Sequence, residues 1–209
     1  MTISLENIGK RYNYEWIFRG LDFSFRHGNR YAVLGPNGSG KSTLLQIIAG
    51  YLSHNEGRIS YRPEQGSERS LDAAAVFRSL SLATPYLDLI EEFTLLEVLQ
   101  FHRHFKPLLG QMSPMDAIWE VGLEKAADKE IRYFSSGMKQ RAKLAQAILA
   151  DTPVLLLDEP CTNLDAEGVG LYHLLLEKYA ADRVVIISSN DPQEYDLCNV
   201  RLQIGDYKG

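Results

Sequence analysis

The alternation of hydrophobic and polar residues predicts strands in the first part of the chain. Residues 21–25 alternate between apolar and polar side chains, which is typical of a half-buried antiparallel strand, and residues 3–8 carry an earlier apolar pattern. The run 30–34 predicts a buried strand. Apolar residues at helical spacing over 44–48 predict a helix that Gly50 ends, and a glycine-rich loop separates this helix from the strand before it.

The middle of the chain changes to a helical pattern. We expect mostly helix from about residue 94 to about residue 150, beginning with a capping box in which Thr94 caps the helix and Glu97 reaches back. The polar, turn-rich segment Arg62–Arg69 precedes this region and predicts an exposed loop.

Two aliphatic runs follow, over 154–157 and 184–187, and both are typical of strands buried in a parallel sheet. A helix is expected between them, from about Glu167 to Ala180, and Asp191 followed by proline predicts another helix start. This order of elements predicts an α/β core with a helical insertion, preceded by an antiparallel β portion.

Composition is that of a globular protein and excludes some functions. The 209 residues are 45% hydrophobic and 23% charged, and this length allows one large domain or two small ones. The net charge of −5 argues against a dedicated nucleic-acid surface, but not against a local site for an anion. The longest apolar runs have the length of strands, and the N-terminus shows no secretory signal. Cys161 and Cys198 form neither a disulfide framework nor a metal-ligand pattern, so we expect a soluble, cytosolic chain.

A phosphate-binding motif lies between the predicted strand 30–34 and the helix after it. The residues Gly35, Pro36, Asn37, Gly38, Ser39, Gly40, Lys41, Ser42 and Thr43 match the pattern G-x-x-x-x-G-K-[ST]. Backbone N–H groups of such a loop and the N-terminus of the following helix favour phosphate groups. We expect Lys41 to reach the β and γ phosphates of a nucleotide and the Ser42 hydroxyl to ligate Mg²⁺. The motif in this context predicts a P-loop NTPase core.

Two carboxylates follow the aliphatic strand 154–157, at the edge where open α/β sheets bind ligands. Asp158 is placed to hold Mg²⁺, directly or through water, and Glu159 to polarise an attacking water as a general base. The alternative is a strand end with two solvated acids. The phosphate loop in the same chain favours the catalytic interpretation.

The stretch 134–141 predicts a second site for an anion, at the start of a helix. Ser135 supplies a hydroxyl, Gly137 lets the backbone approach a ligand closely, and the helix dipole favours negative charge. Met138 belongs to the apolar face of this helix. Taken by itself, the stretch is explained more simply by a serine N-cap.

Together these motifs, in this order and spacing, resemble the nucleotide-binding subunits of ATP-binding cassette (ABC) transporters. The family signature is usually Leu-Ser-Gly-Gly-Gln followed by a basic residue, Gln and Arg. This chain keeps the serine as Ser135 and the second glycine as Gly137, whereas Ser136 replaces the first glycine and Met138 replaces the first Gln. The segment Thr162–Asp165 is similar to the family's D-loop. Tyr12 stands where the family places an aromatic ring under the adenine, although a core or surface aromatic is the alternative.

The resemblance covers nearly the whole chain and implies one ABC-type ATP-binding domain over 1–209. Within it, about 1–82 and 151–209 would form the core with the β subdomain, and about 83–150 the helical subdomain. The resemblance implies ATP and Mg²⁺ as ligands and a second ABC subunit as partner in a head-to-tail homo- or heterodimer. In that dimer Ser135 and Gly137 would act on the γ-phosphate of the ATP held by the other subunit, and Met138 and Asp165 are further nucleotide-binding residues that the resemblance implies.

A transmembrane permease subunit is the other implied partner. The implied location is therefore cytoplasmic and peripheral, at the inner face of the membrane. No nucleic-acid partner is expected.

Two further positions depart from the family pattern. Pro85 stands where the family usually has a Gln at the start of the helical insertion, and Asn190 stands where it has a switch histidine. Asparagine can donate a hydrogen bond, but it cannot carry charge or shuttle a proton. ATP binding should survive both changes, and the retained Glu159 predicts a slow but real ATPase.

Three functions are compatible with these residues. The first is an ATP-hydrolysing subunit that drives a separate membrane protein, and the second is an ATP-gated binding or assembly module with little hydrolysis. The third is a soluble, non-transport ABC ATPase that acts on nucleic acid or ribosomes. Glu159 argues against the second, and a single phosphate loop with net negative charge argues against the third. We therefore expect the first.

Overall fold

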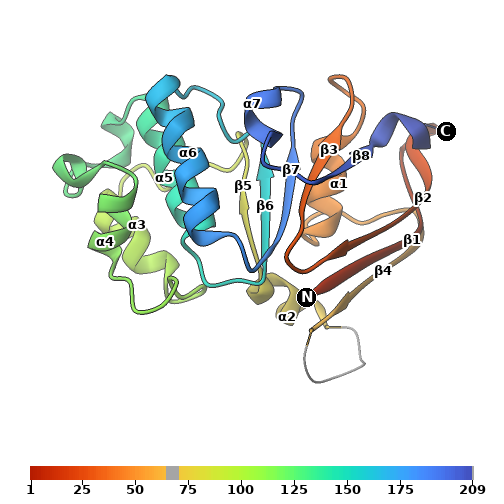
Figure 1. Ribbon diagram of the computed structural model, residues 1–209, viewed down its shortest axis with the longest axis horizontal. Coiled ribbons are helices and arrows are strands. Elements are labelled where there is room, and N and C mark those ends of the chain that lie inside the picture. The colour runs from red at the N-terminus through yellow and green to blue at the C-terminus, as the bar shows by residue number, and fades with distance from the viewer. Residues whose placement is uncertain (65–70, 209) are drawn as a thin grey trace.

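The structure is a computed structural model in which residues 1–64 and 71–208 are described, and they form two sheets. The antiparallel sheet has the order β2-β1-β4 and contains β1 (Thr2–Tyr12), β2 (Glu15–Arg26) and β4 (Glu56–Arg62). The parallel sheet has the order β5-β6-β7-β3-β8. Its strands are β3 (Arg30–Leu34), β5 (Leu80–Ala83), β6 (Val154–Asp158), β7 (Val184–Ser188) and β8 (Val200–Gln203). This arrangement confirms the predicted α/β class with an antiparallel portion (Figure 1).

The parallel sheet is covered on both faces, which explains why its central strands are aliphatic throughout. On β6, Leu155 and Leu157 pack with helices α5 (Ser136–Ile148) and α6 (Ala166–Tyr179) on one face. The alternate residues Val154 and Leu156 pack on the other face, in a second core that includes helix α1 (Lys41–Ile48) and the antiparallel sheet. The sheet therefore separates two hydrophobic cores.

The region expected to be mostly helical is a set of short helices. It contains α3 (Leu95–His102), α4 (Pro114–Glu120), the 3₁₀ turns Glu124–Ala126 and Ile131–Tyr133, and α5. The capping box at the start of α3 is confirmed, since the Glu97 amide donates to Thr94 Oγ1 at 3.2 Å and the Thr94 amide to Glu97 Oε2 at 2.8 Å. Pro107 lies in the segment between α3 and α4, and its missing N–H is one reason why the helical pattern is interrupted there.

Several elements were not predicted from the sequence. They are β4, β5, β8 and the helix α2 (Ala73–Ser79). The segment Arg62–Arg69 was expected to be an exposed loop, but Arg62 is the last residue of β4, and residues 65–69 lie outside the described part of the chain. The predicted helix after Asp191 is confirmed as α7 (Pro192–Tyr195), with the Asp191 side chain accepting from the Gln193 amide at 3.0 Å.

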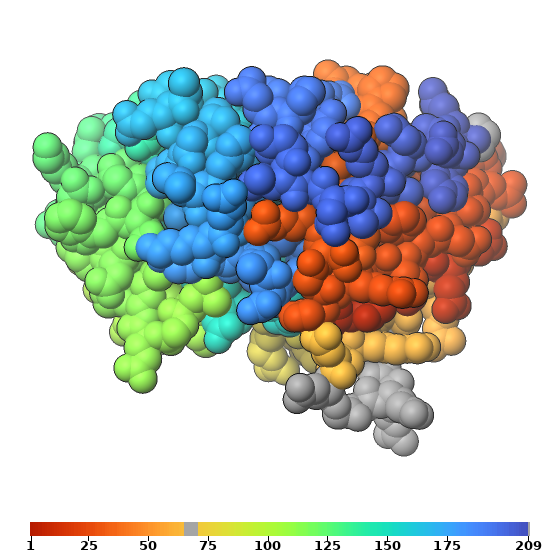
Figure 2. Space-filling view, in the orientation of Figure 1, coloured from red at the N-terminus to blue at the C-terminus, as the bar shows by residue number. Residues whose placement is uncertain are grey.

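The helical part and the antiparallel sheet lie at opposite ends of the molecule. On the face shown in Figure 2, the green helical residues and the red and orange strands are separated by the blue C-terminal segments. Within residues 1–64 and 71–208, none of the helices combines the length and the apolarity needed to span a bilayer.

Candidate functional site

The candidate site lies at one edge of the parallel sheet. Strands β3, β6 and β7 run in the same direction, so the loops that follow them emerge together at their carboxyl ends (Figure 1). The predicted phosphate loop follows β3, Asp158 ends β6 with Glu159 directly after it, and Asn190 follows β7. The fold therefore brings together three segments that are far apart in the sequence.

The phosphate loop is held by its own lysine and by the antiparallel sheet. Lys41 is only 5% exposed, and its ammonium donates to the carbonyl oxygens of Gly35 at 2.8 Å and Pro36 at 3.3 Å. Gly40 has a φ of 99°, and a Cβ there would lie 2.4 Å from Ile17 Cγ2 of β2. Only glycine fits this position, because the loop is both left-handed and in close contact with β2.

Asp158 is a buried carboxylate whose Oδ1 has no hydrogen-bond partner within the described part of the chain. Asp158 is 3% exposed, and the neighbouring Ser188 hydroxyl is also buried and has no partner among the described residues. A charged carboxylate oxygen in such a place calls for a cation or a donor. Carboxylate and hydroxyl oxygens are ligands that Mg²⁺ prefers, so Asp158 and Ser42 fit this ion.

The metal would need further ligands from outside the protein. No group of three or more histidine, cysteine, aspartate or glutamate residues in 1–64 and 71–208 is arranged to hold a metal ion. Mg²⁺ in nucleotide sites typically keeps several waters and binds phosphate oxygens, so one carboxylate and one hydroxyl are sufficient.

Glu159 is half-buried and has an unusual backbone conformation. Its φ is 45°, in the left-handed region that non-glycine residues rarely adopt, and its amide donates to the Ser188 carbonyl at 2.9 Å. Such conformations persist where the surrounding structure enforces them, and they cluster at active sites. The strand end thus turns sharply at the residue predicted to be the general base.

Asn190 makes a contact that the sequence did not reveal. Its side-chain amide donates to Asn37 Oδ1 of the phosphate loop at 2.8 Å. The residue at the switch position is therefore linked to the phosphate loop across the site. At Pro85, the other departure, the Lys143 ammonium of α5 donates to the backbone carbonyl at 3.0 Å, a bond that any residue type at this position could accept.

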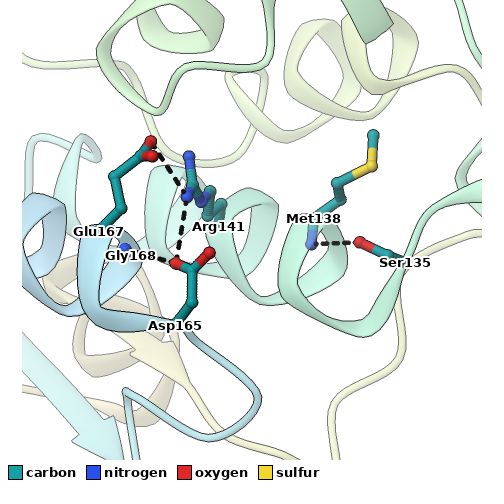
Figure 3. A network of polar contacts seen from close by, with 6 residues as sticks. All are labelled: Ser135, Met138, Arg141, Asp165, Glu167 and Gly168. Atoms are coloured by element: carbon teal, nitrogen blue, oxygen red, sulfur yellow. Dashed lines mark hydrogen bonds and ion pairs between the residues drawn. The ribbon is translucent and has the colours of Figure 1, made fainter.

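The second predicted anion site lies at the starts of helices α5 and α6. Ser135 caps α5, with its Oγ accepting from the Met138 amide at 3.2 Å, and Asp165 caps α6 by accepting from the Gly168 amide at 2.8 Å (Figure 3). Arg141 lies between the caps, 3.6 Å from Asp165 and 3.5 Å from Glu167. The serine N-cap is thus confirmed, and the hydroxyl proton stays free to be donated to a ligand.

A surface groove of about 520 Å³ lies beside the two caps, and Arg141 is one of the residues that line it. Ser135, Gly137, Met138 and Asp165 contribute to it, together with residues of the turn before the 3₁₀ helix at Glu124. No phosphate-loop residue contributes to this lining. The groove and the phosphate loop therefore have no lining residue in common.

Tyr12 is the last residue of β1, and the residue is 49% exposed. The Lys10 ammonium lies 4.9 Å from the centroid of this ring. The hairpin that follows leads into β2, whose Ile17 borders the phosphate loop at Gly40. Stacking of adenine on Tyr12 stays a prediction.

Comparison with known proteins identifies the family. The family model described as ABC transporter matches residues 18–162, which is most of the chain. This chain belongs to the ABC transporter family. It is 31% identical over 205 residues to the uncharacterized ABC transporter ATP-binding protein YybJ of Bacillus subtilis, covering 97% of this chain and 92% of that protein. The ABC chain is thus a nucleotide-binding subunit, as its motifs indicated.

Solved structures of ABC proteins share the fold. A putative ABC transporter ATP-binding protein from Pyrococcus furiosus matches with a TM-score of 0.83 and 22% identity, over 100% of both chains. A dimeric ATP-binding cassette in a post-hydrolysis state, bound to ADP and Pi, matches with a TM-score of 0.81 and 23% identity, over 97% of this chain and 95% of that one. These likenesses confirm the P-loop NTPase fold of the ABC chain.

Proposed function

We propose that this chain binds ATP with Mg²⁺ and hydrolyses ATP to drive a separate transmembrane permease. The observation that carries this proposal is the buried Asp158 Oδ1, which has no partner among residues 1–64 and 71–208, at the same sheet edge as Lys41 and Glu159. A cation site beside a phosphate loop and a carboxylate base is the equipment for transferring a phosphoryl group to water.

Each site residue has a role in this proposal. The loop amides of Gly35–Thr43 and the Lys41 ammonium hold the phosphates, and Tyr12 stacks on the adenine, a contact worth about 1–3 kcal/mol. Ser42 and Asp158 hold Mg²⁺, which neutralises negative charge on the phosphate oxygens when bound. Glu159 accepts the proton of the attacking water.

A second ABC subunit completes the site. One groove contains Ser135, Gly137, Met138 and Asp165, and no phosphate-loop residue lines it. The groove and the phosphate loop are both accessible from solvent. In a head-to-tail homo- or heterodimer, this groove of one chain faces the phosphate loop of the other. The similar fold of a dimeric cassette supports this arrangement.

Turnover is slow in this proposal because two residues that assist hydrolysis in the family are replaced. Asn190 donates a hydrogen bond but cannot transfer a proton, and positioned acid–base groups typically contribute a factor of about 10²–10⁴. The chain works in the cytoplasm, at the inner face of the membrane, where its permease holds it. In this proposal the chain is one ATP-binding domain over 1–209. Its helical subdomain spans about 83–150, and its core consists of about 1–82 and 151–209.

A second candidate function is an ATP-gated assembly module with little hydrolysis. The link between Asn190 and Asn37 favours it, because the side chain at the switch position bonds to the phosphate loop. The retained Glu159 in its strained turn argues for hydrolysis.

The test is ATP turnover by the purified chain, alone and with co-purified membrane partner, against a Glu159→Gln control. We expect phosphate release above the control, and equal ATP affinity of the two proteins by calorimetry. If the wild type and Glu159→Gln release phosphate at equal rates and both bind ATP normally, the result would support the second function, an ATP-gated assembly module. Absence of ATP binding would contradict both functions.

A further inference from the structure

The loop between β6 and α6 is anchored by two buried side chains from different elements. On one side, Gln140 of α5 donates from Nε2 to the Pro160 carbonyl at 2.6 Å. On the other side, Glu194 of α7 accepts a hydrogen bond from the Cys161 amide through Oε1 at 2.7 Å. The exposed fractions of Gln140 and Glu194 are 4% and 5%.

Burying the Glu194 carboxyl costs free energy, because the charged form loses its contact with water. Burial raises the pKa of its carboxyl, and the nearby Asp191 and Glu159 carboxylates raise it further, whereas the Ser189 hydroxyl and the Cys161 amide lower it. A buried carboxyl is favourable only where its hydrogen bonds are made, so its position is set by those donors. A separate bond, from the Tyr172 hydroxyl to the backbone carbonyl of Glu194 at 2.7 Å, does not involve the carboxyl group.

The anchored loop is a compact turn that begins at the general base. The Thr162 amide donates to the Glu159 carbonyl at 3.2 Å, and the Leu164 amide to the Cys161 carbonyl at 2.9 Å. The bond from Glu194 to the Cys161 amide therefore holds the middle of a turn that has Glu159 at one end and Asp165 at the other.

The same short segment also reaches the phosphate loop. Asn190, four positions before Glu194, bonds to Asn37 at 2.8 Å. The segment from 190 to 194 thus contacts the phosphate loop at its first residue and the Glu159 turn at its last.

We propose that Glu194 is a positioning residue for ATP hydrolysis, which fixes the turn carrying Glu159 through the Cys161 amide. This inference rests on the proposed ATPase function. Glu194 does not touch ATP in this role; it determines where the Glu159 carboxylate lies. Displacing a reacting group by about 1 Å can cost a factor of about 10² in rate, so loss of the anchor should appear in kcat.

The test compares two substitutions of the same residue. Glu194→Leu removes the acceptor and leaves the Cys161 amide unpaired, whereas Glu194→Gln keeps an acceptor oxygen at the same reach. For Glu194→Leu we expect kcat per folded protein to fall about 10- to 100-fold, with KM for ATP within about twofold. Glu194→Gln should retain most of the wild-type kcat.

A matched control separates positioning from simple loss of stability. Tyr172→Phe removes a buried hydrogen bond to the same residue but leaves the Glu194 carboxyl and the Cys161 amide intact. It should lower the melting temperature and leave kcat unchanged. If Glu194→Leu changes kcat no more than Tyr172→Phe does, the inference is wrong.

Hydrogen exchange of the Cys161 amide gives a readout that does not depend on turnover. The exchange rate of the Cys161 amide should rise in Glu194→Leu and stay slow in Glu194→Gln. Equal exchange rates in the two variants would show that Glu194 does not hold the Cys161 amide. If the wild-type chain shows no turnover above Glu159→Gln, the proposed function fails, and the positioning role fails with it. If the wild type turns over and Glu194→Leu does so equally well, only the positioning role fails.

Discussion

The phosphate loop offers a quantitative test at Gly40. In Gly40→Ala the new Cβ would lie 2.4 Å from Ile17 Cγ2 and 3.0 Å from Phe18 Cδ1, with the backbone held at a φ of 99°. The left-handed conformation costs a non-glycine residue about 1–2 kcal/mol. Overpacking against the buried Phe18 typically adds about 1–3 kcal/mol. We therefore expect a loss of about 2–5 kcal/mol in the free energy of unfolding.

Gly38→Ala is the matched control in the same loop. Gly38 also has a positive φ, of 78°, but a Cβ there meets nothing within 4 Å. This variant should lose only the conformational term of about 1–2 kcal/mol. Urea unfolding of both variants without nucleotide measures the difference. Equal losses would show that β2 does not pack against the loop at Gly40, and the reasoning would be refuted.

Three further predictions concern other parts of the chain. A double-mutant cycle of Asn190→Ala and Asn37→Ala should give a coupling energy of about 0.5–1.5 kcal/mol in urea unfolding, and zero coupling would contradict the observed bond. Thr94→Ala should cost about 1 kcal/mol through loss of the capping box; an unchanged midpoint would argue against the cap. Burial and the Lys106 ammonium lower the pKa of the half-buried His102 to about 4, so the unfolded chain binds more protons between pH 4 and 6.5. The free energy of unfolding should therefore decrease as the pH falls from 6.5 to 4, and it should decrease less steeply in His102→Gln. Equal pH dependence of the two proteins would contradict the lowered pKa of His102.

Most of the parallel sheet could be predicted because its strands carry their signal locally. β6 and β7 are continuous aliphatic runs, which only a strand buried on both faces requires. β5 has four residues and includes the polar Ser81, whose buried hydroxyl donates to the Ala147 carbonyl at 2.7 Å. That partner is distant in sequence, so nothing near Ser81 indicates that it belongs in a core.

The site shows the same division between local and long-range information. The phosphate loop is a contiguous motif, and the serine cap at Ser135 is satisfied three residues away. The contact of Asn190 with Asn37 joins residues 153 positions apart, and that of Glu194 with Cys161 joins residues 33 apart. Such contacts follow from how the loops are placed by the sheet, which the pattern of residue types does not encode.

The proposed function implies that each ATP is hydrolysed between the phosphate loop of one chain and the groove that contains Ser135 on another. Two inactive proteins test it directly: Lys41→Ala, which damages the phosphate loop, and Ser135→Glu, which places a negative charge at the opposite surface. In a head-to-tail dimer of one copy of each, one site carries both changes and the other site carries neither.

Each protein alone should show no turnover. A 1:1 mixture should regain roughly a quarter of wild-type phosphate release, since half of the dimers are mixed and each has one intact site. A mixture as inactive as its components, although both proteins fold and associate, would contradict a site shared between two chains.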